Sequence, residues 1–371
     1  NKDLKKIIKN KKVYADDANL LFKIINVSNN EVFCKAITDG KLRKGVGINL
    51  EFKTKKNIFL TKKEKKYIRF ADKNLIDFIG ISYAKSKSHL NLIKKQIKNN
   101  LKIIAKIEDK DGLNNASEII KDSDAIMIDR GDLSTSSEIT NVTIAQKKII
   151  KLCNKYSKPS IVATDLLSSL ISNSIPTKSE VSDITNAIYD GCSATMLSQE
   201  TVLAKKPEII VKEMRKIINT TLHNKKKIQK NKFEQNKISQ TITESIVSIC
   251  NKLPITKIVV ITKTGYAAQI LGNKNLSQKI LAVSNNLKVV RMLNLIKNAQ
   301  GIFIPLKFAT NSTNHILYAI KKLWEKKKLD KNDLIISTAI VYPKKGNNMN
   351  LIQIHKVDDI LSVIRSRKNF F

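Results

Sequence analysis

The sequence lacks several features that would place it in other protein classes. It has no run of about 18 apolar residues, the length that a membrane-spanning helix needs, so we expect no membrane partner. Its first residues show no signal-peptide pattern. The cysteines are few and show neither C-x-x-C nor zinc spacing, which favours reduced thiols and a cytoplasmic protein. There are four of them: Cys34, Cys153, Cys192 and Cys250.

Arginine is also scarce, and it accounts for only seven of the 68 basic residues. The formal net charge is +36, but lysine is spread evenly along the 371 residues. A nucleic-acid-binding protein gathers its charge on one face, whereas an even spread of lysine is typical of an AT-rich codon bias. No aromatic-interleaved basic stripe is present. We therefore expect no nucleic-acid partner, although the charge should attract anionic substrates at low salt.

The informative stretch is residues 102–133, which predicts a strand, a helix and a second strand. Each apolar run is too short for a helix and ends in charged residues. Parallel strands that end in charge are typical of an active site at the carboxyl rim of an α/β barrel. Because side chains at i and i+2 share one face of a strand, Lys106 and Glu108 should point the same way. Asp132 should reach the same rim after the next strand.

These residue types can support phosphoryl chemistry. Two carboxylates on neighbouring strand ends, Glu108 and Asp132, can hold a hard divalent cation such as Mg²⁺. A lysine beside that cation, Lys106, can neutralise a phosphoryl group during its transfer. By itself, however, a Lys-x-Glu pattern more often indicates a surface ion pair. An ion-pair network that includes Arg130 is the alternative for the two carboxylates.

Alternating strands and helices predict two α/β units, which occupy residues 53–220 and 238–371. Thr61 and Glu64 have the spacing of a capping box at the start of a helix. A basic, polar connector is predicted at 221–237. The predicted strands of the first unit are 78–83, 103–107, 125–128, 160–163 and 194–197. Those of the second are 257–261, 280–283, 301–304, 334–337 and 351–355.

Four segments resemble motifs of the pyruvate kinase family, in the same order and at matching spacings. They are KIED at 106–109, DRGDLS at 129–134, ATDLLSSL at 163–170, and PTKSEVSDITNAIYDG followed by MLSQET over 176–201. The similarity covers essentially the whole chain. It implies the last five strands of a (β/α)8 TIM barrel, a separate C-terminal α/β domain, and the remnant of an inserted β-rich lid domain. The lid remnant would be residues 1–52, with short strands near 13–17 and 22–27.

The family's barrel has eight strands, and its first three precede the lid. We therefore expect an N-terminally incomplete gene product; a naturally shortened paralogue is the alternative. In the family, the segments before the lid supply phosphate-binding arginines and the ligands of K⁺. A K⁺ requirement is thus implied by the resemblance, with ligands outside this chain.

The resemblance implies transfer of the phosphoryl group of phosphoenolpyruvate to ADP, giving pyruvate and ATP. The implied cofactor is Mg²⁺ or Mn²⁺, held by Glu108 and Asp132, and the implied assembly is a homotetramer. Lys106 would stabilise the phosphoryl group in transit. Backbone amides of Gly131 and Asp132 would hold the substrate carboxylate, and Ser82 would contact the phosphoryl group or a cation.

Thr164 corresponds to a family threonine that lies beside the substrate and assists protonation of the enolate. Because a threonine hydroxyl is a weak acid, a chain of water molecules is the better proton donor. The alternative is that Thr164 or Asp165 caps a helix. Ser198 and Glu200 resemble a further motif, with packing and capping at the rim as the alternative.

The chain departs from the family pattern most sharply at Asp129, where the family has a small alanine. Near a cation Asp129 could be a third ligand; otherwise it should weaken phosphoenolpyruvate binding. Further departures are Lys85, Ser134, Asp165, Ser168 and Gln199.

Two short loops leave their roles open. The loop 262–267 resembles one that binds a phosphorylated effector in many members, although capping by Thr264 is the simpler expectation. Asp16 and Asp17 fit either a turn or a nucleotide contact.

Two rival functions stay open. One is a catalytically weakened relative that binds an effector or a partner. The other is a different magnesium-dependent barrel enzyme that acts on an enolate.

Overall fold

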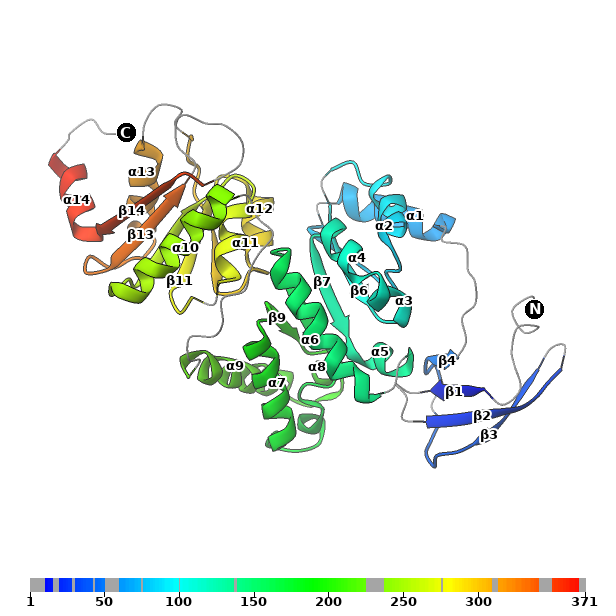
Figure 1. Cartoon of the computed structure of the whole chain (residues 1–371). Coiled ribbons are helices and arrows are strands. Elements are labelled where there is room, and N and C mark those ends of the chain that lie inside the picture. The colour runs from blue at the N-terminus through cyan, green and yellow to red at the C-terminus, as the bar shows by residue number, and fades with distance from the viewer. Residues whose placement is uncertain are drawn as a thin grey trace. The chain divides into compact units, whose positions relative to one another are not determined.

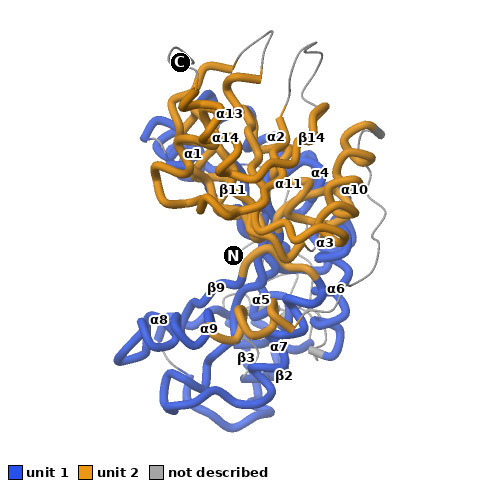
Figure 2. Tube along the Cα trace, turned by 90° about the vertical axis from the view of Figure 1, so that its left-hand side faces the viewer, with its two compact units in different colours: residues 1–152, 160–190, 195–215 blue, residues 153–159, 191–194, 216–371 orange. Residues whose placement is uncertain are grey.

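The computed structural model describes most of the chain (Figure 1). The described residues are 11–15, 20–28, 31–42, 44–50, 60–74, 76–99, 101–136, 139–224, 237–274, 276–308, 313–339 and 349–366. The chain divides into two compact units, shown in Figure 2. They comprise residues 1–152, 160–190 and 195–215, and residues 153–159, 191–194 and 216–371. Within the described ranges, no helix has both the length and the apolar character to cross a membrane.

A five-stranded sheet organises the larger part of the first unit. Its strands lie in sequence order, and the pairs from β5 to β8 are parallel. Side chains such as Ile103, Ile126 and Val162 are almost fully buried, as expected for a parallel sheet covered on its faces. The strands are β5 (Phe78–Ile81), β6 (Lys102–Ile107), β7 (Ala125–Asp129), β8 (Ser160–Ala163) and β9 (Ala194–Met196).

Helices connect these strands, as the alternating pattern predicted. The predicted capping box is confirmed at the first of them: the Glu64 amide donates to Thr61 Oγ1 at 3.1 Å, and the Thr61 amide donates to Glu64 Oε2 at 2.7 Å. The helices are α1 (Lys62–Lys73), α2 (Lys87–Lys94), α3 (Lys110–Asn114), α4 (Ala116–Asp122), α5 (Arg130–Ser136), α6 (Ile139–Lys155), α7 (Lys178–Asp190), α8 (Gln199–Leu203) and α9 (Pro207–His223).

Two sequence expectations at strand ends are wrong. The strand predicted at 78–83 ends at Ile81, because Tyr83 turns the backbone into the left-handed region with φ +49°. Thr164 and Asp165 cap no helix: they have φ values of +71° and +51° and form a turn after β8. The short 3₁₀ helix that follows, Ser168–Ile171, begins after Leu167.

A small antiparallel sheet precedes α1, where the sequence predicted short strands. Its order is β3-β2-β1-β4. The strands are β1 (Lys12–Ala15), β2 (Leu20–Val27), β3 (Val32–Ala36) and β4 (Ile48–Leu50). Asp16 and Asp17 lie outside the described residues, so the choice between a turn and a nucleotide contact stays a prediction. The limits 1–52, 53–220 and 238–371 also stay predictions.

The second unit contains another five-stranded sheet, in the order β12-β11-β10-β13-β14, with only the β13–β14 pair antiparallel. Alternate residues of β10 face opposite sides: Val259 belongs to one buried cluster and Val260 to the other. The strands are β10 (Lys257–Ile261), β11 (Lys279–Ser284), β12 (Ala299–Phe303), β13 (Leu334–Ala339) and β14 (Leu351–Lys356). The helices are α10 (Lys237–Lys252), α11 (Tyr266–Gly272), α12 (Leu287–Leu293), α13 (Asn314–Glu325) and α14 (Val357–Ser366).

The loop after β10 does not use the predicted cap. The residue before α11 is Gly265, in a left-handed conformation with φ +88°. Its amide donates to the hydroxyl of Thr262 at 2.9 Å, whereas the Thr264 hydroxyl is 3.5 Å from the Tyr266 amide. Thr262 is therefore the hydroxyl that holds this turn.

Candidate active site

The register of the first sheet brings three strand ends to one rim. Ile107 of β6 lies beside Ile128 of β7, and Asp129 of β7 lies beside Ala163 of β8. The residues that follow these strands therefore emerge next to one another. This is the place where ligands bind in folds built on parallel strands.

Lys106 lies at the centre of this rim. It forms an ion pair with Glu108, which confirms that the two side chains share a face of the strand. Its Nζ is also 3.1 Å from Asp129 Oδ2 and 3.4 Å from Ser82 Oγ. Burial alone would lower the pKa of Lys106, but the bonds to Glu108 and Asp129 outweigh it and raise that pKa. Lys106 therefore stays cationic at neutral pH.

Tyr83 joins the two predicted metal ligands. Its amide donates to Glu108 Oε2 at 2.6 Å, and its hydroxyl donates to Asp132 Oδ1 at 3.0 Å. These bonds help to hold Tyr83 in its left-handed conformation, which is unfavourable for a bulky residue. Burial, and then the nearby charge of Asp132, raise the pKa of the Tyr83 hydroxyl, so it remains a donor.

Three carboxylates converge beside Lys106. One oxygen from each of Glu108, Asp129 and Asp132 lies within 4.8 Å of the other two. Glu108 and Asp129 are buried, and burial raises the pKa values of Glu108 and Asp132. Oxygen-only donors at this spacing fit a hard divalent cation such as Mg²⁺ or Mn²⁺, which would compensate their charge.

Thr164 and Gly131 meet at the same rim. The Gly131 amide donates to Thr164 Oγ1 at 2.9 Å, and that hydroxyl donates to the Ala163 carbonyl oxygen at 2.6 Å. The structure therefore brings together all the predicted site residues: Ser82, Lys106, Glu108, Gly131, Asp132 and Thr164. The amide of Gly131, however, has a protein acceptor, so a substrate carboxylate would have to share or replace it.

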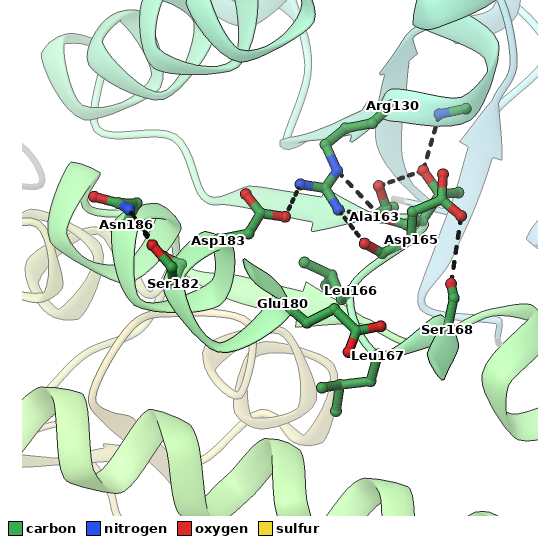
Figure 3. Close-up of polar contacts among 12 residues, drawn as sticks. Arg130, Ala163, Asp165, Leu166, Leu167, Ser168, Glu180, Ser182, Asp183 and Asn186 are labelled. Atoms are coloured by element: carbon green, nitrogen blue, oxygen red, sulfur yellow. Dashed lines mark hydrogen bonds and ion pairs between the residues drawn. The ribbon is translucent and has the colours of Figure 1, made fainter. Parts of the chain in front are cut away.

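Arg130 holds the turn after β8 in place. Figure 3 shows its guanidinium group between the carboxylate of Asp183, on α7, and the backbone near Asp165. Nε donates to the Thr164 carbonyl oxygen at 3.1 Å, and Nη2 donates to that of Asp165 at 2.9 Å. Arg130 thus fixes the position of Thr164, which is a structural role and not part of the carboxylate network.

The buried side chain of Glu200 stabilises the same turn through hydrogen bonds. It is 1% exposed, and its carboxylate accepts bonds from the amides of Leu166 at 3.1 Å, Leu167 at 3.4 Å and Ser198 at 2.7 Å. Glu180, labelled with Leu166 and Leu167 in Figure 3, accepts a bond from the Thr177 amide at the start of α7. The packing and capping alternative therefore describes Glu200.

Sequence reasoning missed two features of this site. The first is Tyr83, whose amide role has no sequence signal and whose hydroxyl reaches across 49 residues to Asp132. The second is the ion pair of Arg130 with Asp183, 53 residues away. Asp129 was identified as a departure, and its place next to Lys106 explains why it matters.

Comparisons with known proteins agree with this geometry. A family model described as the pyruvate kinase barrel domain matches residues 2–211, and one described as the pyruvate kinase alpha/beta domain matches residues 240–355. The chain belongs to the pyruvate kinase family. The pyruvate kinase of Thermotoga maritima is 30% identical to this family member over 357 residues, which cover 95% of this chain and 76% of that protein.

Two other relatives show how much of each chain is covered by the similarity. The pyruvate kinase of Staphylococcus saprophyticus is 32% identical, with 92% of this chain covered. The chain spans about 60% of the length of that relative. A solved structure of Cryptosporidium parvum pyruvate kinase in complex with ADP aligns with a TM-score of 0.83 and 25% identity, covering 95% of this chain and 73% of that one. The α/β fold with a barrel domain and a separate C-terminal domain is thereby established for this family member.

Proposed function

We propose that this protein transfers the phosphoryl group of phosphoenolpyruvate to ADP, giving pyruvate and ATP. The observation that carries the proposal is the convergence of Lys106, Glu108 and Asp132 at one rim. Phosphoryl transfer needs positioning and charge neutralisation rather than a covalent nucleophile, and these residues can supply both. The C. parvum relative was solved with ADP, which supports a nucleotide as the acceptor.

Each residue has a role in this proposal. Lys106 Nζ, with Ser82 Oγ 3.4 Å away, would contact the oxygens of the phosphoryl group. Glu108 and Asp132 would hold Mg²⁺ or Mn²⁺. When bound, the cation would neutralise the negative charge that develops on the enolate oxygen. The K⁺ requirement rests on the family resemblance, and we assign it no ligands.

Gly131 and Thr164 would act together on the substrate. The amides of Gly131 and Asp132 would bind its carboxylate, which would loosen the present bond from Gly131 to Thr164. Because the Thr164 hydroxyl already donates to Ala163, protonation of the enolate is better served by water that Thr164 orients. Removing the hydroxyl should therefore slow the protonation of the enolate more than it weakens substrate binding.

A lactate-dehydrogenase-coupled assay on the full product of the gene tests the proposal. Pyruvate should form only when phosphoenolpyruvate, ADP and a divalent cation are all present. ADP-independent pyruvate formation would instead indicate another enolate-handling enzyme. The Thr164→Val variant should retain substrate binding while losing most of its turnover.

A catalytically weakened relative is the second candidate, because Asp129 adds a negative charge beside the residues that would bind the phosphoryl group. No ATP formation at saturating substrates, from a protein that still binds Mn²⁺, would favour it.

We also propose a homotetramer in the cytoplasm, as the family resemblance implies. Apolar side chains on the first unit are strongly exposed, including Ile175 at 76% and Val202 at 79%. Light scattering at micromolar concentration would test the assembly, because a monomer would leave these side chains in water.

A further inference from the structure

Asp129 distinguishes this site from the motif that it resembles. It is the last residue of β7, it is 8% exposed, and its carboxylate joins those of Glu108 and Asp132 within 4.8 Å. In the family segment that resembles residues 129–134, alanine occupies this position. A buried carboxylate therefore faces the proposed cation where the motif has only a methyl group.

We infer that Asp129 is a third carboxylate ligand, so that this site binds a divalent cation before the anionic substrate arrives. The inference rests on the proposed function and adds a feature of this chain to it. The formal charges support it: three carboxylates and Lys106 sum to about −2, which one divalent cation balances. With alanine in place of Asp129 the sum would be about −1, and the cation would leave a net positive site.

The spacing of the oxygens is compatible with one coordination shell. In an octahedral shell with Mg²⁺–oxygen distances of about 2.1 Å, adjacent oxygens are about 3.0 Å apart and opposite oxygens about 4.2 Å apart. Because only one of the three pairs can be opposite, the side chains, whose oxygens lie within 4.8 Å of one another, would rotate inward around a bound cation. Lys106, which bridges Glu108 and Asp129, would be released by the cation and become available to the phosphoryl group.

The same residue should weaken binding of phosphoenolpyruvate. Its carboxylate adds negative charge beside Lys106, where an anionic substrate needs a positive site. Asp129 should thus raise the affinity for the cation and lower the affinity for phosphoenolpyruvate. A carboxylate that only neighbours the cation would change the two affinities in the same directions, but by less than a direct ligand does.

The test measures Mn²⁺ binding by electron paramagnetic resonance on the whole protein, without substrate. Asp129→Ala should weaken Mn²⁺ binding about 10- to 100-fold, because ligand charge sets the affinity of such sites. Calorimetry at saturating Mn²⁺ should show that the same variant binds phosphoenolpyruvate several-fold more tightly. Asp129→Asn, which keeps the shape of the side chain, should show the same two shifts even if the alanine variant folds poorly.

Two further variants complete the experiment. Glu118→Gln removes an exposed carboxylate of α4 and should leave both affinities unchanged. Glu108→Gln should reduce Mn²⁺ binding strongly. If Asp129→Asn binds Mn²⁺ like the unaltered protein while Glu108→Gln does not, the inference is wrong and the proposed metal site stands. If the unaltered protein binds no Mn²⁺, both the inference and the proposed metal ligands fail.

Discussion

The two five-stranded sheets share a largely parallel architecture but carry different chemistry at their strand ends. In the first sheet, β6 and β7 end at Lys106, Glu108 and Asp129, which form a charged network. In the second sheet, the carboxyl ends carry neutral hydroxyl groups that are buried. They are Thr262, Ser284 and Thr338.

The second sheet places its charges at the opposite end. Lys257 begins β10 and pairs with Asp333, which directly precedes β13. Asp333 also accepts bonds from the Asp330 amide at 2.7 Å and the Thr256 hydroxyl at 2.8 Å. These bonds and the one from Lys257 outweigh burial and lower the pKa of Asp333. This arrangement stabilises loops, and among the described residues of the second unit no three carboxylates converge as they do in the first. Two similar sheets thus differ in the few residues that adjoin each strand, which is where function is built.

The largest expected difference is in the loss of kcat when Lys106 of the first sheet or Lys257 of the second is replaced. Lys106→Met should reduce kcat by about 1,000-fold, because it removes the ammonium group that would face the phosphoryl group. Lys257→Met should leave kcat unchanged but destabilise the protein by about 3 kcal/mol, because it leaves Asp333 without its ion-pair partner. Coupled assays and denaturant unfolding of both variants measure these effects. Equal losses of kcat in the two variants would remove the distinction between the sheets.

A smaller difference is expected between the buried acceptors. Glu200→Leu leaves the amides that now bond to its carboxylate unsatisfied and should cost about 3 kcal/mol of unfolding free energy. Thr262→Val removes a neutral acceptor of one amide and should cost about 1 kcal/mol. Urea unfolding gives both values. A Thr262 variant that lost more stability than the Glu200 variant would show that charge is not what stabilises these turns.

The smallest expected effect is the change in folding stability at acid pH. Burial lowers the pKa of His315, whose ring nitrogens make no hydrogen bond within the described part of the chain. Below about pH 6.5 the unfolded chain binds a proton that the folded chain does not, so stability should fall as pH decreases from there. Burial raises the pKa values of Glu108 and Asp132, so the folded chain binds their protons first, and acid should stabilise that rim.

Tryptophan fluorescence can separate these two responses. The single tryptophan, Trp324, lies on α13 with His315, so it reports on the second unit. The melting temperature that Trp324 reports should fall by a few degrees between pH 7.5 and pH 5.0. It should fall by less in His315→Leu, in which His355 still has a pKa lowered by burial. An equal decrease in the variant would assign the acid response to other groups.

The sequence predicted the strands well because their signal is local. The runs at 103–107 and 160–163 are short, apolar and rich in β-branched residues, and both are strands within one residue of the prediction. The capping box at Thr61 and Glu64 is also local. The turns at the strand ends were not predicted, because no residue near Tyr83 or Thr164 in the sequence indicates a left-handed backbone. Those conformations are held by bonds from distant residues such as Glu108 and Arg130.

By itself, the sequence determined which candidate residues lie at neighbouring strand ends, since strand periodicity and motif order need only neighbours along the chain. It placed Lys106 and Glu108 on one face of a strand and Asp132 just after the next strand. Only the tertiary structure decided how these groups interact: Asp129 completes the carboxylate cluster, and Tyr83 links Glu108 to Asp132. The physical reason is that ion pairs and hydrogen bonds act over a few ångströms in space, and packing alone brings residues from separate strands within that range.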